Sequence, residues 1–478
     1  MSISSALQNA TSGLFASARA VQVASANVAN AMTAGYAPRR IELTSATLGG
    51  TGAGVRITGI TREVDPVLVG MLRDADATSQ AGTRNTAFWT RIEGAVGLPG
   101  AGIQAALSNF ETALISASDR PDLDSRLAKV ASAAVTLADT IGAAGDTVQI
   151  LRAEADAAIA RDVEALNTGL GRVDALNAEI TRLRAAGQET LGLEDQRQAL
   201  ISDLAAIVPM REYARADGRI TLFSAGGQLL LDLDPQEIGF TPAPAMDASM
   251  TPGAGLSGLT VGGLAVTADA SGPLAGGTLA ASVTLRDTIA PGIQAELDTL
   301  AADLIARFQD PQADATLGPG VAGLFTDAGA ALSGSPAAGL TARLGVNPAV
   351  LPDQGGALWR LRDGLGAASP GAVGNASGLA ALLGALDRTV SPGPGMPAQS
   401  LSASLGDLSA RLSTHAQAAQ DSALTESARY AELNDQMLAQ GVDTDAEMQR
   451  LLTIEQSYAA NARVIQTADA MLQRLLEI

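Results

Sequence analysis

The sequence predicts a mainly α-helical, multidomain protein with a β insertion (α+β), in which the N- and C-terminal helices pair as a coiled coil. Apolar or small residues recur with alternating steps of four and three along residues 3–31, and again along residues 451–475. A 3.5-residue repeat keeps one narrow stripe facing a partner helix. Between these stripes, a long helical pattern is followed by short apolar runs separated by Gly and Pro, which is typical of strands and turns.

The N-terminal stripe alternates large and small side chains. Its members are Ile3, Leu7, Ala10, Leu14, Ser17, Val21, Ala24, Val28 and Ala31. So few large residues bury too little area to offset the conformational entropy lost when such a helix becomes ordered. We therefore expect this helix to become ordered only when further copies of the chain pack around it.

The C-terminal stripe has the same spacing. It comprises Leu451, Ile454, Tyr458, Asn461, Ile465, Ala468, Leu472 and Leu475. An Asn at a seam position fixes the register of a coiled coil at some cost in stability. The box Thr444-Asp445-Ala446-Glu447 predicts reciprocal capping at the start of this helix. Residues 1–32 and 443–478 are thus expected to form one terminal coiled-coil domain.

A linker and a helical bundle follow the first helix. Residues 33–64 predict an extended, partly β linker, with strand-like segments at 41–44 and 55–58 split by a glycine-containing turn. Asp65-Pro66 supplies an N-cap and a proline at the first helical position. We predict a bundle from residues 65–208, 286–310 and 401–442. Its longest stripe shifts phase between Ala155 and Val163, and Gly187 is expected to close that helix.

The remaining segments differ in composition. Residues 209–285 predict a β-rich outer domain, with strands at 219–223, 228–231, 259–266 and 278–285. Residues 311–400 are rich in Gly, Pro, Ala and Ser, and no domain is assigned to them. Because bundle segments flank the insertion and helices flank the bundle, both chain ends should meet at one pole.

Bulk composition excludes several classes of function. The net charge of −19 argues against nucleic-acid binding, which needs a basic surface. The absence of cysteine removes disulfides, thiolate metal sites and cysteine nucleophiles. Residues 1–15 have no uninterrupted apolar core, and no apolar run approaches the roughly 18 residues that span a membrane. We expect no cleaved signal peptide, no membrane insertion, no cofactor and no metal.

The sequence offers little for catalysis. The single histidine, His415, lies on a polar helix and is expected to be solvated. The glycine run at residues 50–54 precedes a strand-like segment and no Gly-Lys-Ser/Thr follows it, so it predicts a turn rather than a phosphate loop. Asp443, Asp445 and Glu447 lack the length and glycine of a calcium loop, and helix capping accounts for them better. We therefore expect that the protein is not an enzyme.

Motifs at both ends resemble those of a known family. Residues 12–14 (Ser-Gly-Leu), 25–30 (Ser-Ala-Asn-Val-Ala-Asn) and 33–36 (Thr-Ala-Gly-Tyr) closely resemble the N-terminal signature of bacterial flagellar rod, hook and hook-associated proteins. Residues 447–472 look like the closing motif of the same family, with Glu455-Gln456, Tyr458 and the run from Ala460 to Ile465. These motifs cover about 36 and 35 residues.

The middle of the chain narrows the resemblance. A helical segment of about 100 residues precedes the β segment, and residues 166–167, 176–180 and 193–197 resemble the hook-associated members that form the hook–filament junction. The resemblance spans residues 1–308 and 401–478.

The resemblance implies a structural, non-enzymatic protein of the extracellular flagellum, exported by the flagellar type III apparatus. It implies contacts with further copies in a helical ring, with hook protein, with the next junction protein, and with an export chaperone on the C-terminal helix. The expected assembly residues are Ile3, Leu7, Leu14, Val21, Asn27, Val28, Asn30, Gly35, Tyr36, Leu451, Tyr458, Asn461, Ile465, Leu472 and Leu475.

Two other functions remain open. A hook or rod subunit is also structural, but it would polymerise without limit. A secreted peptidoglycan-cleaving or adhesive enzyme on a coiled-coil stalk is a different class, and a triad in it would have to use His415.

Overall fold

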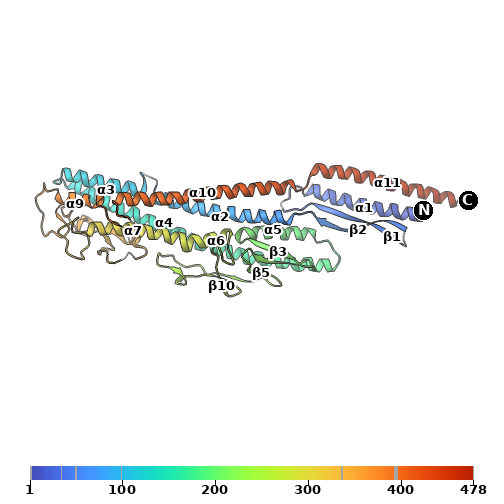
Figure 1. The fold of residues 1–478 in the computed structure, drawn as a ribbon, viewed down its shortest axis with the longest axis horizontal. Coiled ribbons are helices and arrows are strands. Elements are labelled where there is room, and N and C mark those ends of the chain that lie inside the picture. The colour runs from blue at the N-terminus through green and yellow to red at the C-terminus, as the bar shows by residue number, and fades with distance from the viewer. Residues whose placement is uncertain are drawn as a thin grey trace.

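The computed structural model describes residues 3–33, 35–48, 51–97, 100–334, 337–391 and 397–476. They form a long, thin, mostly helical molecule with both chain ends at one tip (Figure 1). At that tip, α1 (Ile3–Ala29) and α11 (Thr444–Leu476) lie side by side. The strands β1 (Arg39–Leu48) and β2 (Thr51–Arg62) pair as an antiparallel hairpin along α1, and they contain both predicted strand segments of the linker.

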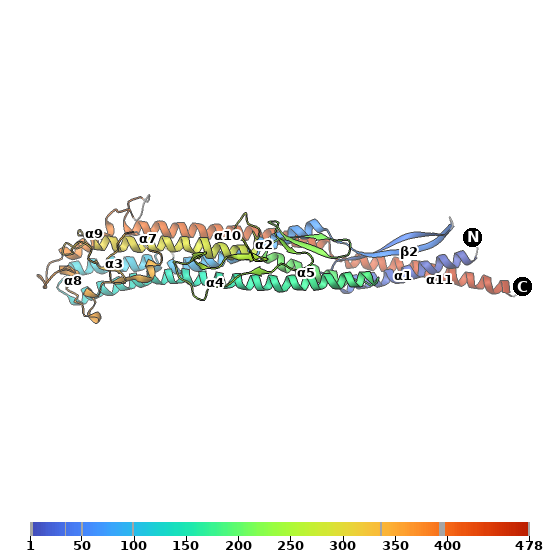
Figure 2. The same ribbon diagram turned by 90° about the horizontal axis from the view of Figure 1, so that it is seen from below.

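A bundle of long helices makes up the rest of the rod (Figure 2). Helix α2 (Pro66–Val96) runs antiparallel to α10 (Leu401–Ala439), so that Leu68 packs near Leu433 and Thr86 bonds to Ala419. As predicted, Asp65 caps α2 and Pro66 is its first residue. The other bundle helices are α3 (Gly102–Asp119), α4 (Asp124–Ala185), α5 (Leu191–Ile207) and α7 (Ala290–Gln309).

Helix α4 serves two separate hydrophobic cores. Its buried residues from Leu127 to Ala155 belong to the larger core, and those from Ile159 to Val173 belong to the smaller one. The predicted phase shift falls at this boundary. Each four-residue step rotates the stripe by about 40° on a helix of 3.6 residues per turn, which turns the apolar side of α4 from one core to the other.

Among the described residues, α4 is the one helix whose length and composition alone would allow it to cross a membrane. Its most apolar stretch of 18 residues is 44% buried inside the protein. The packing described above is that of a bundle core helix, and such helices meet the same criterion.

The β insertion is smaller than predicted. One sheet has the order β3 (Met210–Ala214), β4 (Ile220–Ser224), β5 (Leu229–Leu231), and a second has the order β10 (Leu264–Val266), β9 (Leu259–Val261), β6 (Ile238–Gly239). The strands β7 (Thr251–Pro252) and β8 (Gly255–Leu256) form a short parallel pair. The single strand predicted at 259–266 is a hairpin, because Gly262 and Gly263 adopt positive φ and turn the chain.

The strand predicted at 278–285 is wrong. Those residues form α6 (Gly277–Thr284) and the start of a π-helical turn (Leu285–Ile289) that continues into α7. Thr278, Leu279, Ala280 and Ser282 are all buried. Because α6 is enclosed on most sides by α2, α4 and α5, its sequence shows no polar face, and its Thr and Val residues suggested a strand instead.

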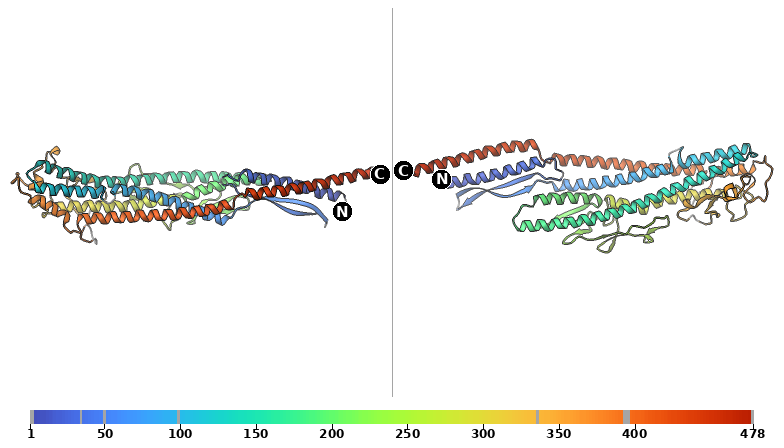
Figure 3. Two further views of the ribbon diagram at one scale, coloured as in Figure 1. Left: turned by 90° about the horizontal axis from the view of Figure 1, so that it is seen from above. Right: turned by 180° about the vertical axis from the view of Figure 1, so that it is seen from behind.

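Residues 311–400 cap the end of the rod that lies far from the termini (Figure 3). They include β11 (Phe325–Asp327) paired with β12 (Leu344–Val346), three 3₁₀ turns (Leu340–Arg343, Pro348–Val350, Pro352–Gln354), α8 (Arg360–Asp363) and α9 (Ser377–Asp387). Phe325 packs edge-on against Phe110 of α3 and Phe308 of α7, with ring centroids 5.7 and 5.1 Å apart. This segment, unassigned from sequence, thus completes the larger core.

Candidate assembly surface and the polar neck beneath it

Small residues bring α1 and α11 together. Ala10, Ala16 and Ala24 of α1 are buried, as is Ala468 of α11. A Cβ placed on Gly13 would lie only 2.6 Å from Nδ2 of Asn461, so the amide of Asn461 rests directly on the backbone of α1. The two helices can therefore approach closely while burying little apolar area.

The large residues of the N-terminal stripe lie to one side of that contact. Ile3, Leu7, Leu14 and Val28 are half-buried, and Val21 is 37% exposed. At about 100° per residue, these positions cluster on a face roughly a quarter-turn away from the buried alanines. The predicted stripe is thus divided: its small members Ala10, Ser17 and Ala24 are buried, while its large members stay partly uncovered.

The C-terminal stripe is also only partly covered. Leu451, Asn461 and Ile465 are half-buried, whereas Tyr458 and Leu472 are 49% and 40% exposed. The side chain of Leu475 lies outside the described residues. None of the hydrophobic clusters identified among the described residues includes a residue of α1 or α11, so these two helices share no such apolar core of their own.

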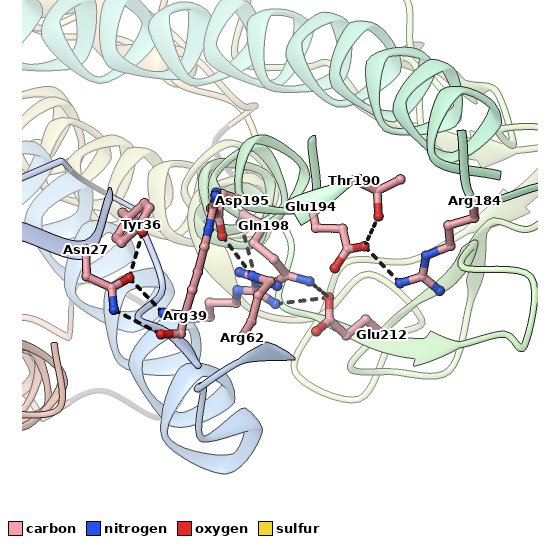
Figure 4. Close-up of polar contacts among 11 residues, drawn as sticks. Asn27, Tyr36, Arg39, Arg62, Arg184, Thr190, Glu194, Asp195, Gln198 and Glu212 are labelled. Carbon is pink, nitrogen blue, oxygen red and sulfur yellow. Dashed lines mark hydrogen bonds and ion pairs between the residues drawn. The ribbon is translucent and has the colours of Figure 1, made fainter. Parts of the chain in front are cut away.

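Below this helix pair, Asn27 is the centre of a polar cluster (Figure 4). Its Nδ2 donates to the Arg39 carbonyl at 2.9 Å and to Glu447 Oε1 at 3.1 Å. Its Oδ1 accepts from the Tyr36 hydroxyl at 2.8 Å and from the Arg39 backbone N–H at 3.0 Å. Asn27 is fully buried, and its amide makes four bonds that join α1, β1 and α11.

The capping box predicted at Thr444–Glu447 is wrong in detail. Asp443 is the cap, and its Oδ1 accepts from the backbone N–H groups of Asp445 and Ala446, each at 3.0 Å. Glu447 turns away from the helix end and accepts from Asn27 and, at 2.8 Å, from Arg450. The physical reason is that the buried amide of Asn27 needs an acceptor, and Glu447 supplies it.

Three other residues expected at the assembly surface lie at this level. The guanidinium of Arg39 sits over the ring of Tyr36, 5.1 Å from its centroid, and burial raises the pKa of Tyr36, which therefore stays a neutral donor. Gly35 has φ +78°, and a Cβ there would meet Ala199 of α5 at 3.3 Å. Asn30 bonds back to Ala26 of its own helix.

Helix α5 provides the bundle side of these contacts. Asp195 accepts from Arg39 at 3.2 Å and from Arg62, at the end of β2, at 2.8 Å. Farther along α5, Gln198 accepts from Arg73 of α2 at 2.6 Å. We call this region the neck; it comprises residues 27–30, 35–40, 60–66, 189–199 and 440–447.

A second carboxylate lies in the first turn of α5, just after the connection from α4. Glu194 accepts from the Thr190 hydroxyl at 2.7 Å and from Arg184 at 2.8 Å. Burial acts to raise the pKa of Glu194, but these hydrogen bonds and the neighbouring arginines outweigh it and hold the pKa below its ordinary value. The carboxylate is therefore held in its charged form, which fixes the corner.

Several contacts in the neck and in the helix pair above it were not expected from sequence. Ser12 accepts from the Val55 N–H of β2 at 3.1 Å, while its neighbour Gly13 contacts Asn461, so adjacent motif residues bind two different elements. Glu447 accepts a hydrogen bond from Asn27, which is 420 positions away in the sequence, and Asp195 accepts one from Arg39, which is 156 positions away. The Ser-Gly pair is a sequence signal for Ser12 and Gly13, but local patterns carry no signal for such distant partners.

The described residues show little that is typical of catalysis. No group of three or more His, Cys, Asp or Glu side chains lies close enough within them to hold a metal ion. His415 is exposed and stacks on Trp89, with ring centroids 5.2 Å apart. The neck instead has the chemistry of a structural joint, in which polar groups satisfy one another.

Two family models match the chain. The flagellar hook-associated protein FlgK helical domain matches residues 89–323, and the C-terminal region of the flagellar basal body rod FlgEFG proteins matches residues 436–478. The first match covers α3, α4, α5 and the β insertion, and the second covers α11.

Curated relatives carry a consistent name. Flagellar hook-associated protein 1 of Escherichia coli strain K12 is 28% identical over 242 residues, covering 48% of this chain and 43% of that protein. The Bacillus subtilis strain 168 protein of the same name is 25% identical over 249 residues, covering 49% of each. The match therefore spans less than half the length of these relatives.

A solved structure, that of the flagellar hook junction protein FlgK from Burkholderia pseudomallei, is similar with a TM-score of 0.44 and 22% identity, covering 54% of this chain and 46% of that one. The family models match the bundle and the C-terminal helix separately, and the relatives of both bacteria carry the name of one protein. Together the family models and the shared name of the relatives support recognition of this chain as a relative of flagellar hook-associated protein 1 (FlgK).

Proposed function

We propose that this protein is a structural component of the bacterial flagellum that forms the junction between hook and filament and polymerises through its terminal helices. One observation carries the proposal. The helices α1 and α11 meet through alanines and a glycine, and they leave large apolar side chains uncovered along the outside, among them Phe15 at 71% exposure. Large apolar side chains left exposed along one helix pair are typical of a protein interface.

Neighbouring copies would supply the missing burial. In a ring, the uncovered face of α1 would contact helices of adjacent subunits, so that Leu7, Leu14 and Val21 enter a shared core. The rod-shaped bundle would then lie outside the ring of terminal helices, because both chain ends are at one tip of the molecule (Figure 1). Hook protein below and the next junction protein above would be the neighbours along the axis.

The same surface would need protection before assembly. Leu452, Tyr458 and Met471 of α11 are each about half exposed, and an unshielded apolar helix is prone to aggregate. We propose that an export chaperone covers α11 in the cell. The chain would then leave through the flagellar type III apparatus and reach its extracellular place at the hook end.

A strain that lacks this protein tests the proposal directly. Electron microscopy should show hooks without filaments, and flagellin should appear in the culture medium. Expression of the intact chain should restore filaments. Loss of the hooks themselves, or growth of long tubes by the purified protein alone, would instead support a hook or rod subunit.

We further propose that the protein has no catalytic role. Its polar clusters join elements of the fold, and the ring of the exposed His415 stacks on the ring of Trp89. A hydrolytic activity of the purified protein that disappears in His415→Ala would contradict this and favour the secreted-enzyme alternative.

A further inference from the structure

The terminal helix pair is attached to the bundle mainly through charged groups. Between α1 with its hairpin and α5 with its preceding turn, the structure shows the ion pairs Arg39–Asp195, Arg62–Asp195 and Arg19–Glu189, and the close approach of Gly35 to Ala199. The Arg19–Glu189 pair is 41% and 46% exposed, and such surface pairs contribute little. The side chains around Asp195 are only 12–18% exposed, so the attachment depends chiefly on them.

Asp195 lies between two like charges. Arg39 and Arg62 are directly opposite each other at the open end of the β1–β2 hairpin. Like charges at opposed positions of an antiparallel pair repel each other and destabilise it. Each oxygen of Asp195 accepts from one of the two arginines, Oδ2 from Arg39 and Oδ1 from Arg62 (Figure 4). We call these three residues the Asp195 bridge.

From Arg39, bonded groups continue to the last helix. Both backbone polar groups of Arg39 bond to the side-chain amide of Asn27, and that amide donates to Glu447 of α11. The guanidinium of Arg39 bonds to the bundle while its backbone bonds to α1. Displacement of Arg39 would therefore loosen the hairpin, α1 and α11 from the bundle together.

We propose that the Asp195 bridge is the joint that fixes the terminal helix pair to the bundle, with Asp195 holding the hairpin base closed against the repulsion of Arg39 and Arg62. The joint goes beyond the assembly role proposed above, since it concerns how one chain holds its two parts in fixed relation. It requires a carboxylate at position 195 and not merely a polar group, because only a negative charge offsets both guanidinium charges.

Hydrogen exchange of the full-length chain, followed by mass spectrometry, tests the joint. In Asp195→Asn, amides at residues 35–41 and 58–63 should exchange about tenfold faster or more, because the two arginines then face each other without a counter-charge. Amides of α4 at residues 163–180 should be unchanged. Asp203→Asn is the matched control: Asp203 is exposed on the same helix, has no ion pair within the part of the chain that the structure describes, and should alter neither region.

Two further variants test whether Asp195→Asn acts through the repulsion between Arg39 and Arg62 or only by making α5 less stable. Arg62→Gln should open the hairpin base less than Asp195→Asn does, because it removes the repulsion together with one ion pair. The double variant Asp195→Asn/Arg62→Gln should exchange more slowly at residues 35–41 than Asp195→Asn alone. Unchanged exchange in Asp195→Asn, or a double variant that exchanges faster than Asp195→Asn, would overturn the proposal. Neither result would affect the proposed flagellar role, which the gene-deletion phenotype tests separately.

Discussion

At the scale of single residues, Asn27 shows how one buried amide can hold three elements in place. A primary amide has two donor hydrogens and an acceptor oxygen with two lone pairs, and Asn27 uses all four. Its partners are a hydroxyl, a carboxylate and both polar groups of one backbone residue. Since buried polar groups without partners are costly, removal of this amide affects every one of them.

We expect Asn27→Ala to loosen the neck. The variant leaves the Arg39 backbone, Tyr36 and Glu447 without their central partner, at about 1–3 kcal/mol for the groups that remain buried. Hydrogen exchange at residues 35–41 should accelerate about tenfold or more as a result.

Asn30→Ala is the matched control, because Asn30 bonds to its own helix and, through its Oδ1, to Thr33 nearby. It should change exchange at residues 35–41 much less than Asn27→Ala. Equal effects of the two variants would show that Asn27 acts only through the helix and not through the neck.

Glu194 gives the corner between α4 and α5 a dependence on pH. The pKa of this carboxyl is lower in the folded chain than in the unfolded chain, where it is about 4.3. Its contribution to stability is therefore complete well above pH 4.3 and is lost as the pH falls through the folded pKa. Glu194→Gln should unfold at lower urea than the native chain at pH 7, and this difference should shrink below pH 4.3. The exposed Glu164→Gln on α4 should show no such pH-dependent difference.

Sequence reasoning at this scale identified Asn27, Gly35 and Tyr36 through a motif, but placed them with the assembly residues. The structure puts them in the neck, where their roles depend on Glu447, Arg39 and α5. Such partners are fixed by the fold and leave no periodic signal in the sequence. Every buried amide needs hydrogen-bond partners, but which residue accepts from it can be identified only from the folded structure.

At the scale of elements, periodicity was informative where a helix has one buried face. Asp65 caps α2 as predicted, α4 ends two residues before Gly187, and α10 begins at residue 401, where the last predicted bundle segment begins. The same reasoning failed for α6, which is enclosed by other helices and has no polar side. Periodicity also did not reveal that the stripe of α1 divides into a buried and a partly exposed set. A 3.5-residue repeat does not show which of its residues pack inside the same chain.

Gly13 of α1 contacts the side-chain amide of Asn461 in α11. We expect Gly13→Val to displace the Asn461 side chain and disturb the packing of α1 on α11, because even the first side-chain carbon would overlap that amide. Cells that carry this variant should show few filaments by electron microscopy.

Gly70→Val controls for the change of residue type, since Gly70 is also helical and nothing lies within 4 Å of a Cβ there. It should leave filaments intact. Thermal unfolding of the bundle, followed by circular dichroism, should be similar in both variants, and normal filaments in Gly13→Val would contradict the close approach.

At the scale of the whole molecule, apolar burial is concentrated away from the termini. The two large cores lie in the bundle and its distal end, while α1 and α11 bury mainly alanine. The free energy that holds a segment closed follows from the apolar contacts it makes. The rod should therefore be stable in its middle and weakly held at the tip that carries both chain ends.

We expect hydrogen exchange to show this gradient in a dilute monomer. Amides at residues 3–24 and 448–472 should exchange within seconds to minutes, whereas those of α4 between residues 127 and 173 should be protected for hours. In assembled material the terminal amides should become protected. Strong protection of residues 3–24 in the dilute monomer would mean that α1 and α11 hold each other without neighbours.

Leu472→Asp tests the uncovered face in the cell. Leu472 is 40% exposed on α11, so an isolated chain should tolerate a charge there and keep its bundle stability. In the assembly the same side chain would be enclosed by neighbours, and burial of an unpaired carboxylate costs several kcal/mol. The variant should fail to enter the flagellum and should bind the export chaperone poorly.

Leu424→Asp is the matched control, because it makes the same change at a 61% exposed leucine on α10 of the bundle, and it should assemble normally. Motility and filament retention equal to the native strain in Leu472→Asp would show that α11 does not face its neighbours through this side.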